Sequence, residues 1–194
     1  MEVNGYHSPE AAGGLDYSTN GSLVLPGMYS VVLKYGSEQT RQSFSVALDP
    51  RLHPTDADLA ERLALTRRIE ADMNALNRDL NRALAAREKL QKAVSSHGLA
   101  QRRAAPTEDA LSESIDRVVQ MKIRSSEGDS MQESKLHACL AYLVADIEIA
   151  YARPMEAQYA VFRDLDQQEK AGEQALDAAV AKADHLINVN VKSP

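Results

Sequence analysis

The sequence predicts a mainly α-helical fold: an antiparallel helical bundle of three to four helices, one of them very long, preceded by a small β-hairpin. Apolar residues recur at helical and heptad spacing through most of the chain, and they alternate with polar residues in one short stretch near its beginning. The 194 residues include seven Tyr, two Phe and no Trp. A core so poor in aromatic side chains must be built from Ala, Leu, Ile, Val and Met, which suits helix packing better than a β-sandwich. The length corresponds to one ordinary domain, and we expect an irregular N-terminal arm at 1–25, a hairpin at 26–50 and a helical bundle at 55–188.

The alternating stretch predicts a β-hairpin. Pro26-Gly27 opens it, and the apolar side chains that follow lie on one face of a half-buried strand, namely Tyr29, Val31, Leu33 and Tyr35. Gly36-Ser37 fits a tight turn, after which the returning run places Phe44, Val46 and Leu48 on one face. A two-stranded hairpin is only marginally stable in water, so this one either packs on the helices or pairs with strands elsewhere.

Residues 56–96 predict one long helix. Thr55 is a suitable N-cap, and Asp56 and Asp58 lie in the first turn, where the helix dipole favours acidic side chains. Two rows at heptad spacing form a coiled-coil-like seam, interrupted at Arg87: Leu59, Thr66, Met73, Leu80 and Val94 in one row, and Ile69, Leu76, Ala83 and Leu90 in the other. Such a helix extends about 60 Å, so its packing partners must be comparably long.

Three further helices are expected. The second begins at Pro106-Thr107 and ends near 125–128, with one face formed by Leu111, Ile115, Val118, Val119, Lys122 and Ile123. The third carries a stripe of Leu136, Leu140, Leu143, Ile147 and Tyr151, with Cys139 and Val144 beside it. Pro154 ends that helix and begins the fourth, whose apolar residues are Tyr159, Phe162, Leu165, Leu176, Ala179, Ala183 and Leu186. Gly172 is its weak point, about 1 kcal/mol less favourable than Ala, and residues from 188 onward should fray.

The charge distribution favours packing between helices and disfavours nucleic-acid binding. The net charge is −6, whereas nucleic-acid binding requires a basic surface. Residues 55–106 carry a net charge of +3 and residues 107–190 a net charge of −8, so that neighbouring helices can attract one another. No apolar run reaches the length of a membrane span, and the first thirty residues do not form a signal peptide.

Few residues form a pattern that carries chemistry. Glu133 and His137 stand four apart, the spacing of two metal ligands on one helix, but no second pair completes a site. Asp164 and Asp166 diverge on a helix and make a poor acid/base pair. The single cysteine, Cys139, lies beside an apolar stripe, as a packed thiol usually does. The other groups that we considered are scattered or too few: His7, His53, His97, His185, Arg102-Arg103 and the sequon at Asn20-Gly21-Ser22. We therefore expect no catalytic, metal-binding or cofactor-binding residue.

Four segments, in order, carry a resemblance to a known family. The first is 21–33 (GSLVLPGMYSVVL) followed by 44–51 (FSVALDPR), and the other three are 118–127 (VVQMKIRSSE), 134–143 (SKLHACLAYL) and 154–165 (PMEAQYAVFRDL). Together they resemble the C-terminal region of bacterial sortilin-like, BNR-repeat β-propeller proteins, often labelled glycosyl hydrolases. The resemblance implies that the hairpin is the remnant of a β-sandwich and that any glycosidase chemistry belongs to a propeller absent from this chain. One departure is Pro154-Met155, where the family usually has Pro-Thr.

The expected function is therefore that of a non-catalytic structural or docking module, an accessory domain whose partner is a β-propeller. An alternative is a free-standing helical interaction protein that self-associates through the seam between Leu59 and Val94. A third hypothesis is an enzyme whose site combines scattered carboxylates with His137. The resembled family is typically exported, whereas this sequence shows no export signal, so the compartment stays open.

Overall fold

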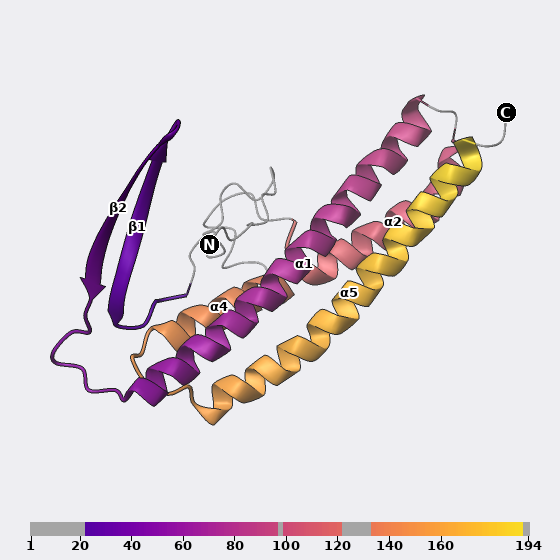
Figure 1. Cartoon of the computed structure of the whole chain (residues 1–194). Helices are drawn as coiled ribbons and strands as arrows, with labels where there is room; N and C mark the ends of the chain where they lie inside the picture. The colour runs from indigo at the N-terminus through magenta and orange to yellow at the C-terminus, as the bar shows by residue number, and fades with distance from the viewer. Residues whose placement is uncertain (1–21, 97–98, 122–132, 192–194) are drawn as a thin grey trace.

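The computed structural model describes residues 22–96, 99–121 and 133–191. Two strands, β1 (Gly27–Tyr35) and β2 (Glu38–Val46), precede four helices: α1 (Asp56–Ser96), α2 (Gln101–Val118), α4 (Leu136–Glu148) and α5 (Glu156–Val191). The predicted fold class, a helical bundle behind a small hairpin, is confirmed (Figure 1). No helix in these three ranges combines the length and the apolar character that a membrane crossing needs.

The bundle is built on two long helices that run in the same direction. Arg68 of α1 pairs with Asp166 of α5, and further along both helices Arg82 pairs with Asp177, so the two helices are parallel. α2 and α4 run back along this pair, one after the other (Figure 1). Together α2 and α4 span about 47 Å at 1.5 Å per residue, against about 62 Å for α1. The result is a three-helix bundle in which α1 and α5 contact each other directly and α2 and α4 together take the place of the third helix.

The start of α1 is capped as the sequence predicts. The amide of Asp58 donates to Thr55 Oγ1 at 3.1 Å, and the amide of Thr55 donates to Asp58 Oδ2 at 3.0 Å. This is a capping box in which an aspartate takes the usual place of glutamate. Arg153, from the connection between α4 and α5, binds Asp58 at 3.1 Å and Glu61 at 3.3 Å. Arg153 therefore ties the connection between α4 and α5 to the beginning of α1.

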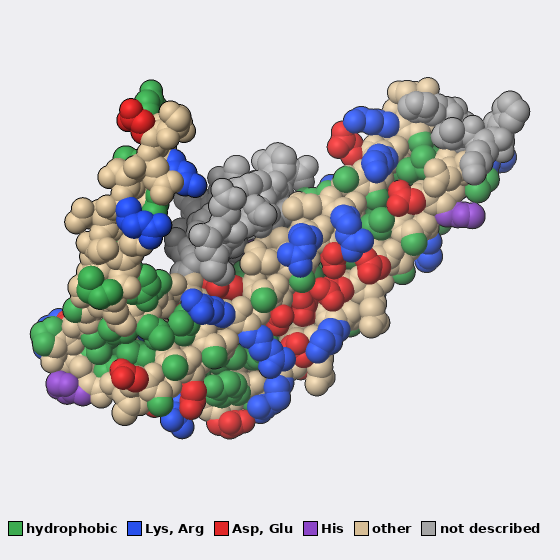
Figure 2. Space-filling model, viewed as in Figure 1, with side chains coloured by type: hydrophobic (Ala, Val, Ile, Leu, Met, Phe, Trp, Pro, Cys, Tyr) green, Lys and Arg blue, Asp and Glu red, His purple; other side chains and the backbone are tan. Residues whose placement is uncertain are grey.

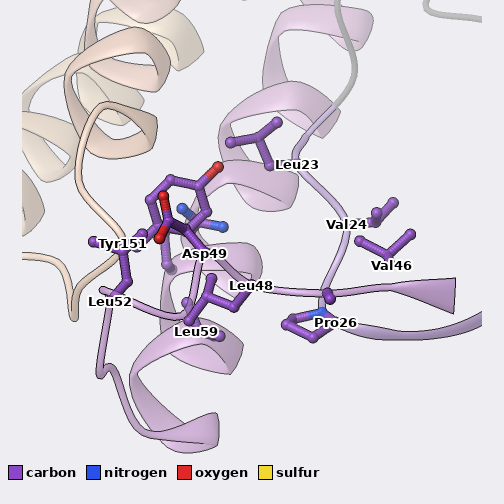
Figure 3. A pocket seen from close by; sticks show the side chains of 11 residues that line it. Leu23, Val24, Pro26, Val46, Leu48, Asp49, Leu52, Leu59 and Tyr151 are labelled. Atoms are coloured by element: carbon purple, nitrogen blue, oxygen red, sulfur yellow. The ribbon is translucent and has the colours of Figure 1, made fainter.

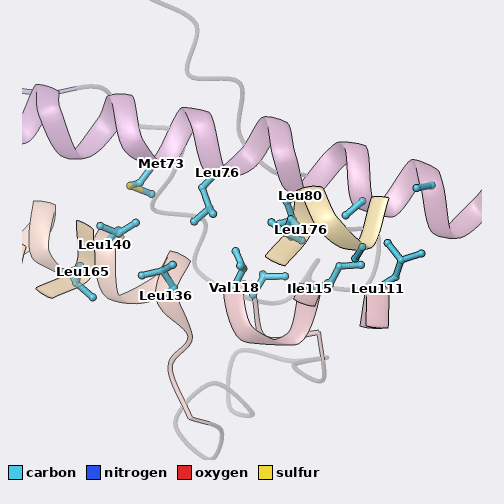
Figure 4. Packing of buried hydrophobic residues seen from close by; sticks show 14 of the residues in the cluster. Met73, Leu76, Leu80, Leu111, Ile115, Val118, Leu136, Leu140, Leu165 and Leu176 are labelled. Carbon is cyan, nitrogen blue, oxygen red and sulfur yellow. The ribbon is translucent and has the colours of Figure 1, made fainter. Parts of the chain in front are cut away.

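The predicted seam forms the core side of α1. All of its residues are buried except Val94, which is partly buried. Beyond Ala83, Ala86 and Ala93 are buried in addition to Leu90, and Arg87, which interrupts the seam, is partly buried. Figure 4 shows Leu76 and Leu80 above residues of the other three helices, among them Ile115, Val118, Leu136 and Leu176. The described residues of the later stripes are buried too, apart from Tyr159 and Leu186, which are partly buried, and Tyr151, which is exposed and lies after α4.

The predicted boundaries of the second helix are wrong. α2 begins at Gln101, and Pro106 lies inside it, because burial of Leu99 and Ala104 draws the first turn into the bundle. α2 also ends earlier than expected, at Val118, since Val119 is buried in an extended conformation (φ −132°, ψ 142°). The predicted stop at 125–128 lies outside the described residues, as do Lys122 and Ile123.

Gly172 is a close-packing position within α5. A Cβ built there would lie 3.3 Å from Val118 Cγ2 and 3.7 Å from Leu136 Cδ2. These two side chains belong to the end of α2 and the start of α4, so the glycine faces the junction between these two helices. α5 continues to Val191, three residues beyond the predicted end at 188.

The hairpin forms with the predicted turn at Gly36-Ser37 but is not half-buried. β1 and β2 pair antiparallel from Gly27↔Val46 to Tyr35↔Glu38, and Gly36 supplies the positive φ (+58°) of the turn. Val31, Leu33 and Tyr35 are 55%, 65% and 84% exposed. The expectation of burial is wrong because the hairpin extends away from the helices and only its base reaches them (Figure 1).

Candidate docking surface on the hairpin

The register of the hairpin gives it one face with an apolar row and one mainly polar face. Directly opposite residues share a face. Tyr29 lies opposite Phe44, and Val31, Leu33 and Tyr35 continue the apolar row along β1, with the polar Gln42, Thr40 and Glu38 opposite them on β2. The polar face carries Ser30, Lys34, Gln39, Arg41, Ser43 and Ser45, with Met28 and Val32 among them. We call the apolar set the hairpin face: Tyr29, Val31, Leu33, Tyr35 and Phe44.

The side chains of the hairpin face are packed near the base of the hairpin and exposed to solvent near its turn. The rings of Tyr29 and Phe44 stack with centroids 6.1 Å apart, and Tyr29 Oη donates to the carbonyl oxygen of Leu25 at 2.7 Å. Phe44 is nevertheless 47% exposed, and exposure rises through Val31 and Leu33 to Tyr35 at the turn. A contiguous row of apolar side chains left in water costs free energy that covering it would recover.

The base of the hairpin is fastened to the lower end of the bundle. The amide of Leu23 donates to Glu148 Oε1 at 2.8 Å, and Ser22 Oγ donates to Thr66 Oγ1 at 3.1 Å. A pocket of about 300 Å³ lies between the base and the bundle. In Figure 3, Leu23 and Val24 from the lead-in, Val46 from the end of β2 and Tyr151 from beyond α4 surround this pocket.

A row of carboxylates between α1 and α5 is the most unusual electrostatic feature of the described residues. Asp72, Asp166 and Glu169 each offer an oxygen within 4.8 Å of the others. Lys170 Nζ binds Asp166 Oδ2 at 2.6 Å, and Arg68 approaches the same carboxylate at 3.6 Å. Figure 2 shows acidic side chains gathered along the middle of the bundle, with basic side chains on both sides.

Burial controls the titration of this acidic cluster (Asp72, Asp166 and Glu169). Glu169 is only 4% exposed. Burial, and then the charges of Asp72, Glu173 and Asp166, raise the pKa of Glu169 to about 7, against the opposing effect of Lys170. Burial likewise raises the pKa of Asp72, with the charge of Asp166 adding to it. The three oxygens are hard ligands of the kind that Mg²⁺ or Ca²⁺ takes, but Lys170 and Arg68 already compensate Asp166.

The pair Glu133 and His137 does not form a metal-ligand pair on one helix. α4 begins at Leu136, so Glu133 precedes the helix and lies exposed, where Lys135 Nζ binds its Oε2 at 3.0 Å. Cys139 is partly buried, and its Sγ donates to the carbonyl oxygen of Ser134 at 3.9 Å. Burial, aided by the charge of Glu133, raises the pKa of the Cys139 thiol. A raised pKa disfavours the thiolate that a nucleophile requires.

The remaining sequence candidates do not come together. Asp164 and Asp166 diverge as predicted: Gln168 binds Asp164 Oδ2 at 2.8 Å, whereas Asp166 faces α1. His53 and His185 are exposed at opposite ends of the molecule. Arg102 and Arg103 are exposed side chains on the first turn of α2. His7, His97, Asn20 and Gly21 lie outside the described residues.

Two features of the structure were missed by sequence reasoning. Asp166, Glu169 and Glu173 stand at helical spacing (i, i+3, i+7), which was a signal for an acidic stripe facing α1. The other feature is Arg62, a buried cation at the pocket.

No protein-family model, curated protein or solved structure matches this chain. The resemblance to sortilin-like propeller tails therefore stays a prediction.

Proposed function

We propose that this protein is a non-catalytic docking module whose helical bundle presents a β-hairpin to a β-sheet of another protein or domain. The exposure of the hairpin face carries this proposal. Apolar alternation along a strand is typical of a side chain row that packs on a core. Here the row is formed, but no part of the described chain covers it. A surface that covers this row then comes from outside the described residues.

A β-sheet is the partner that fits the hairpin best. Among the described residues β1 and β2 pair only with each other, so each strand keeps one outer edge with unpaired backbone groups. A partner strand can satisfy such an edge while its sheet covers the apolar face, whereas a helix covers the face alone. The resemblance to the tails of BNR-repeat proteins favours the same class of partner, because a β-propeller is made of antiparallel sheets.

The bundle supports a structural role better than a catalytic one. The carboxyl group with the most strongly raised pKa, Glu169, is buried between α1 and α5, away from the hairpin and the pocket. The thiol of Cys139 is held in its protonated form. Neither group is placed to reach a bound substrate, so we propose no enzymatic activity for this chain.

The alternative is self-association through the coiled-coil-like seam. Leu76, Leu80 and Leu90 are fully buried against the chain's own helices. A dimer through the seam would therefore require the bundle to open and exchange helices. A dimer through the hairpin face would not, and that outcome is included in the test.

Face-specific substitutions test the proposed function. Leu33→Asp places a charge on the hairpin face, and Lys34→Asp, the matched control, places the same charge on the polar face. Each tagged chain is recovered from the cells that naturally produce it, and the bound proteins are identified by mass spectrometry. We expect one β-sheet protein to accompany the wild type and the Lys34 variant but not the Leu33 variant. Both variants should retain the urea midpoint of the wild type, which excludes unfolding as the cause.

Two outcomes would contradict the proposal. The same partner bound equally by both variants would show that the hairpin face is not the docking surface. A purified wild-type chain that sediments as a dimer, and as a monomer after Leu33→Asp, would assign the face to a second copy instead.

A further inference from the structure

We propose that the pocket at the hairpin base binds a small apolar carboxylate, with Arg62 as its counter-ion. The pocket lies beside the hairpin face and is separate from it, so this inference does not depend on the proposed docking function. It follows from the position of one buried cation and from the chemistry of the walls around it.

Arg62 is a buried charge without an anionic partner among the residues that the structure describes. The side chain is 2% exposed. Its Nη1 donates to the carbonyl oxygen of Ala150 at 3.3 Å, and its guanidinium lies 4.8 Å from the ring centroid of Tyr151. No carboxylate of the described chain lies within 4.0 Å of it, although ten such ion pairs form elsewhere in those residues. A guanidinium has five N–H donors in a planar fork that matches a carboxylate, so Arg62 retains donors for one.

The walls of the pocket are mainly apolar. Its lining contains Leu23, Val24, Pro26, Val46, Ala47, Leu48, Leu52 and Leu59, besides Arg62, Asp49 and Tyr151. The volume of about 300 Å³ is at the lower end of the range for ligand sites. A water molecule occupies roughly 30 Å³ of liquid, so the pocket accommodates about ten non-hydrogen atoms, the number in octanoate.

The other charged group at the pocket is already neutralised. Asp49 accepts from Arg51 Nε at 3.0 Å and from Arg51 Nη2 at 2.6 Å. These side-chain bonds, followed by the bond from the Arg51 amide, lower the pKa of Asp49. Asp49 therefore stays ionised and paired with Arg51, which leaves Arg62 as the uncompensated charge at the pocket.

A single uncompensated cation among leucine and valine side chains favours a monoanion with an apolar body. Phosphate and sulfate carry more charge and would lose hydration against apolar walls. A neutral alcohol of the same length would fill the space but leave Arg62 without a counter-ion. Either a free short-chain acid or the C-terminal carboxylate of a peptide ending in an apolar residue supplies the required chemistry.

Calorimetry with the full chain tests the site, using octanoate, 1-octanol, inorganic phosphate and a pair of leucine-terminated peptides, one acid and one amide. We expect octanoate to bind one to one and octanol at least about tenfold more weakly, as expected for loss of a charged hydrogen bond. Octanoate should also shift the NMR signal of the Arg62 Nε–H group. Arg62→Gln should reduce octanoate affinity to that of octanol.

A second variant keeps the test decisive if Arg62→Gln does not fold. Leu52 lines the pocket from an exposed loop, so the Leu52→Asp variant should fold. Its carboxylate should lower the affinity for octanoate at least about tenfold by charge repulsion. Val161→Asp, at an exposed site on α5 outside the pocket, is the matched control and should leave affinity unchanged.

The outcomes separate the sources and the alternatives. Tighter binding of the peptide acid than of octanoate would identify a protein C-terminus as the ligand, and the reverse order a free acid; both support the site. Equal binding of octanoate and octanol, tighter binding of phosphate, no octanoate binding, or octanoate binding unaffected by Leu52→Asp would each overturn the proposal.

Discussion

Tyr29 and Phe44 stack across the two strands of the hairpin, with their ring centroids 6.1 Å apart and their planes at 30°. The pair marks the limit of the part of the hairpin that the bundle holds. Below it, Leu25 accepts the hydroxyl hydrogen bond of Tyr29, and Leu23 is bonded to Glu148. Above it, Val31, Leu33 and Tyr35 have no cover within the described chain. The bundle thus fixes the root of the hairpin and leaves its apolar tip for another surface.

The first prediction concerns the seam. Leu76 is fully buried at the centre of the core, where α1 passes the junction of α2 and α4. Leu76→Ala should lower the free energy of unfolding by about 2–5 kcal/mol, as large-to-small core changes do. Val161→Ala, at an exposed apolar residue of α5, is the control and should change it by less than about 0.5 kcal/mol. Equal effects of the two variants in urea unfolding would contradict the packing.

The second prediction concerns the junction of α2 and α4. Gly172→Leu should lower the free energy of unfolding by about 1–3 kcal/mol, since the added side chain would overlap Val118 and Leu136. Gly172→Ala is the control: the tight contact of its Cβ with Val118 at 3.3 Å is opposed by a gain of about 1 kcal/mol in helix propensity, so its effect should be much smaller. If both variants are more stable than the wild type, Gly172 is only a residue of low helix propensity and the close contact is wrong.

The third prediction is a pH dependence of stability due to Glu169. Its pKa is raised to about 7 in the folded chain, from 4.5 in the unfolded chain. The folded chain therefore binds this proton more tightly, and the stabilisation is complete below about pH 4.5 and is lost as the pH rises through 7. Glu169→Gln, which stays neutral, should be about 1–3 kcal/mol more stable than the wild type at pH 8 and nearly equal to it at pH 4.5.

Urea unfolding at several pH values checks this dependence. Glu113→Gln, at an exposed glutamate of α2, is the matched control. Its free energy of unfolding should differ from that of the wild type by the same small amount at every pH. A Glu169→Gln difference that does not change between pH 4.5 and pH 8 would show that folding does not raise the pKa of Glu169.

The fourth prediction is that the purified chain hydrolyses no aryl glycoside. A glycosidase needs two carboxyl groups about 5–10 Å apart across a sugar-binding cleft. The carboxylates that the structure brings together, the buried Glu169 and the partly buried Asp72 and Asp166, lie within 4.8 Å of one another along the contact of α1 and α5. Turnover that disappears in Glu133→Gln or His137→Ala would contradict the non-catalytic account and support an active site near the start of α4.

Much of the fold could be predicted because local and periodic signals agree. The capping box at Thr55, the heptad rows of α1 and the Gly36 turn each depend on residues close in sequence, and all three are present. The start of α2 could not be predicted from Pro106, since the burial of Leu99 and Ala104 outweighs the cost of a proline inside the helix. A tertiary contact decided that boundary.

The candidate site was predictable only in part, because periodicity does not specify which surface covers an apolar face. Alternation from Tyr29 to Tyr35 predicts the strand and its apolar side correctly, but burial by this chain's own helices does not follow from it. Arg62 gave no signal at all. Its burial depends on Ala150 and Tyr151, which approach it only after α4 has turned back toward the start of α1.

Site-specific photocrosslinking tests the central claim, that the hairpin face docks on a β-sheet, most directly. A benzophenone amino acid replaces Leu33 on the hairpin face in one chain and Lys34 on the polar face in another. Both chains are irradiated in the cells that naturally produce the protein, and the crosslinked peptides are sequenced. The account predicts that position 33 crosslinks to one strand segment of a single β-sheet partner and that position 34 does not. Crosslinks of equal yield from both positions, no crosslink from position 33, or crosslinks only to a second copy of this chain would contradict it.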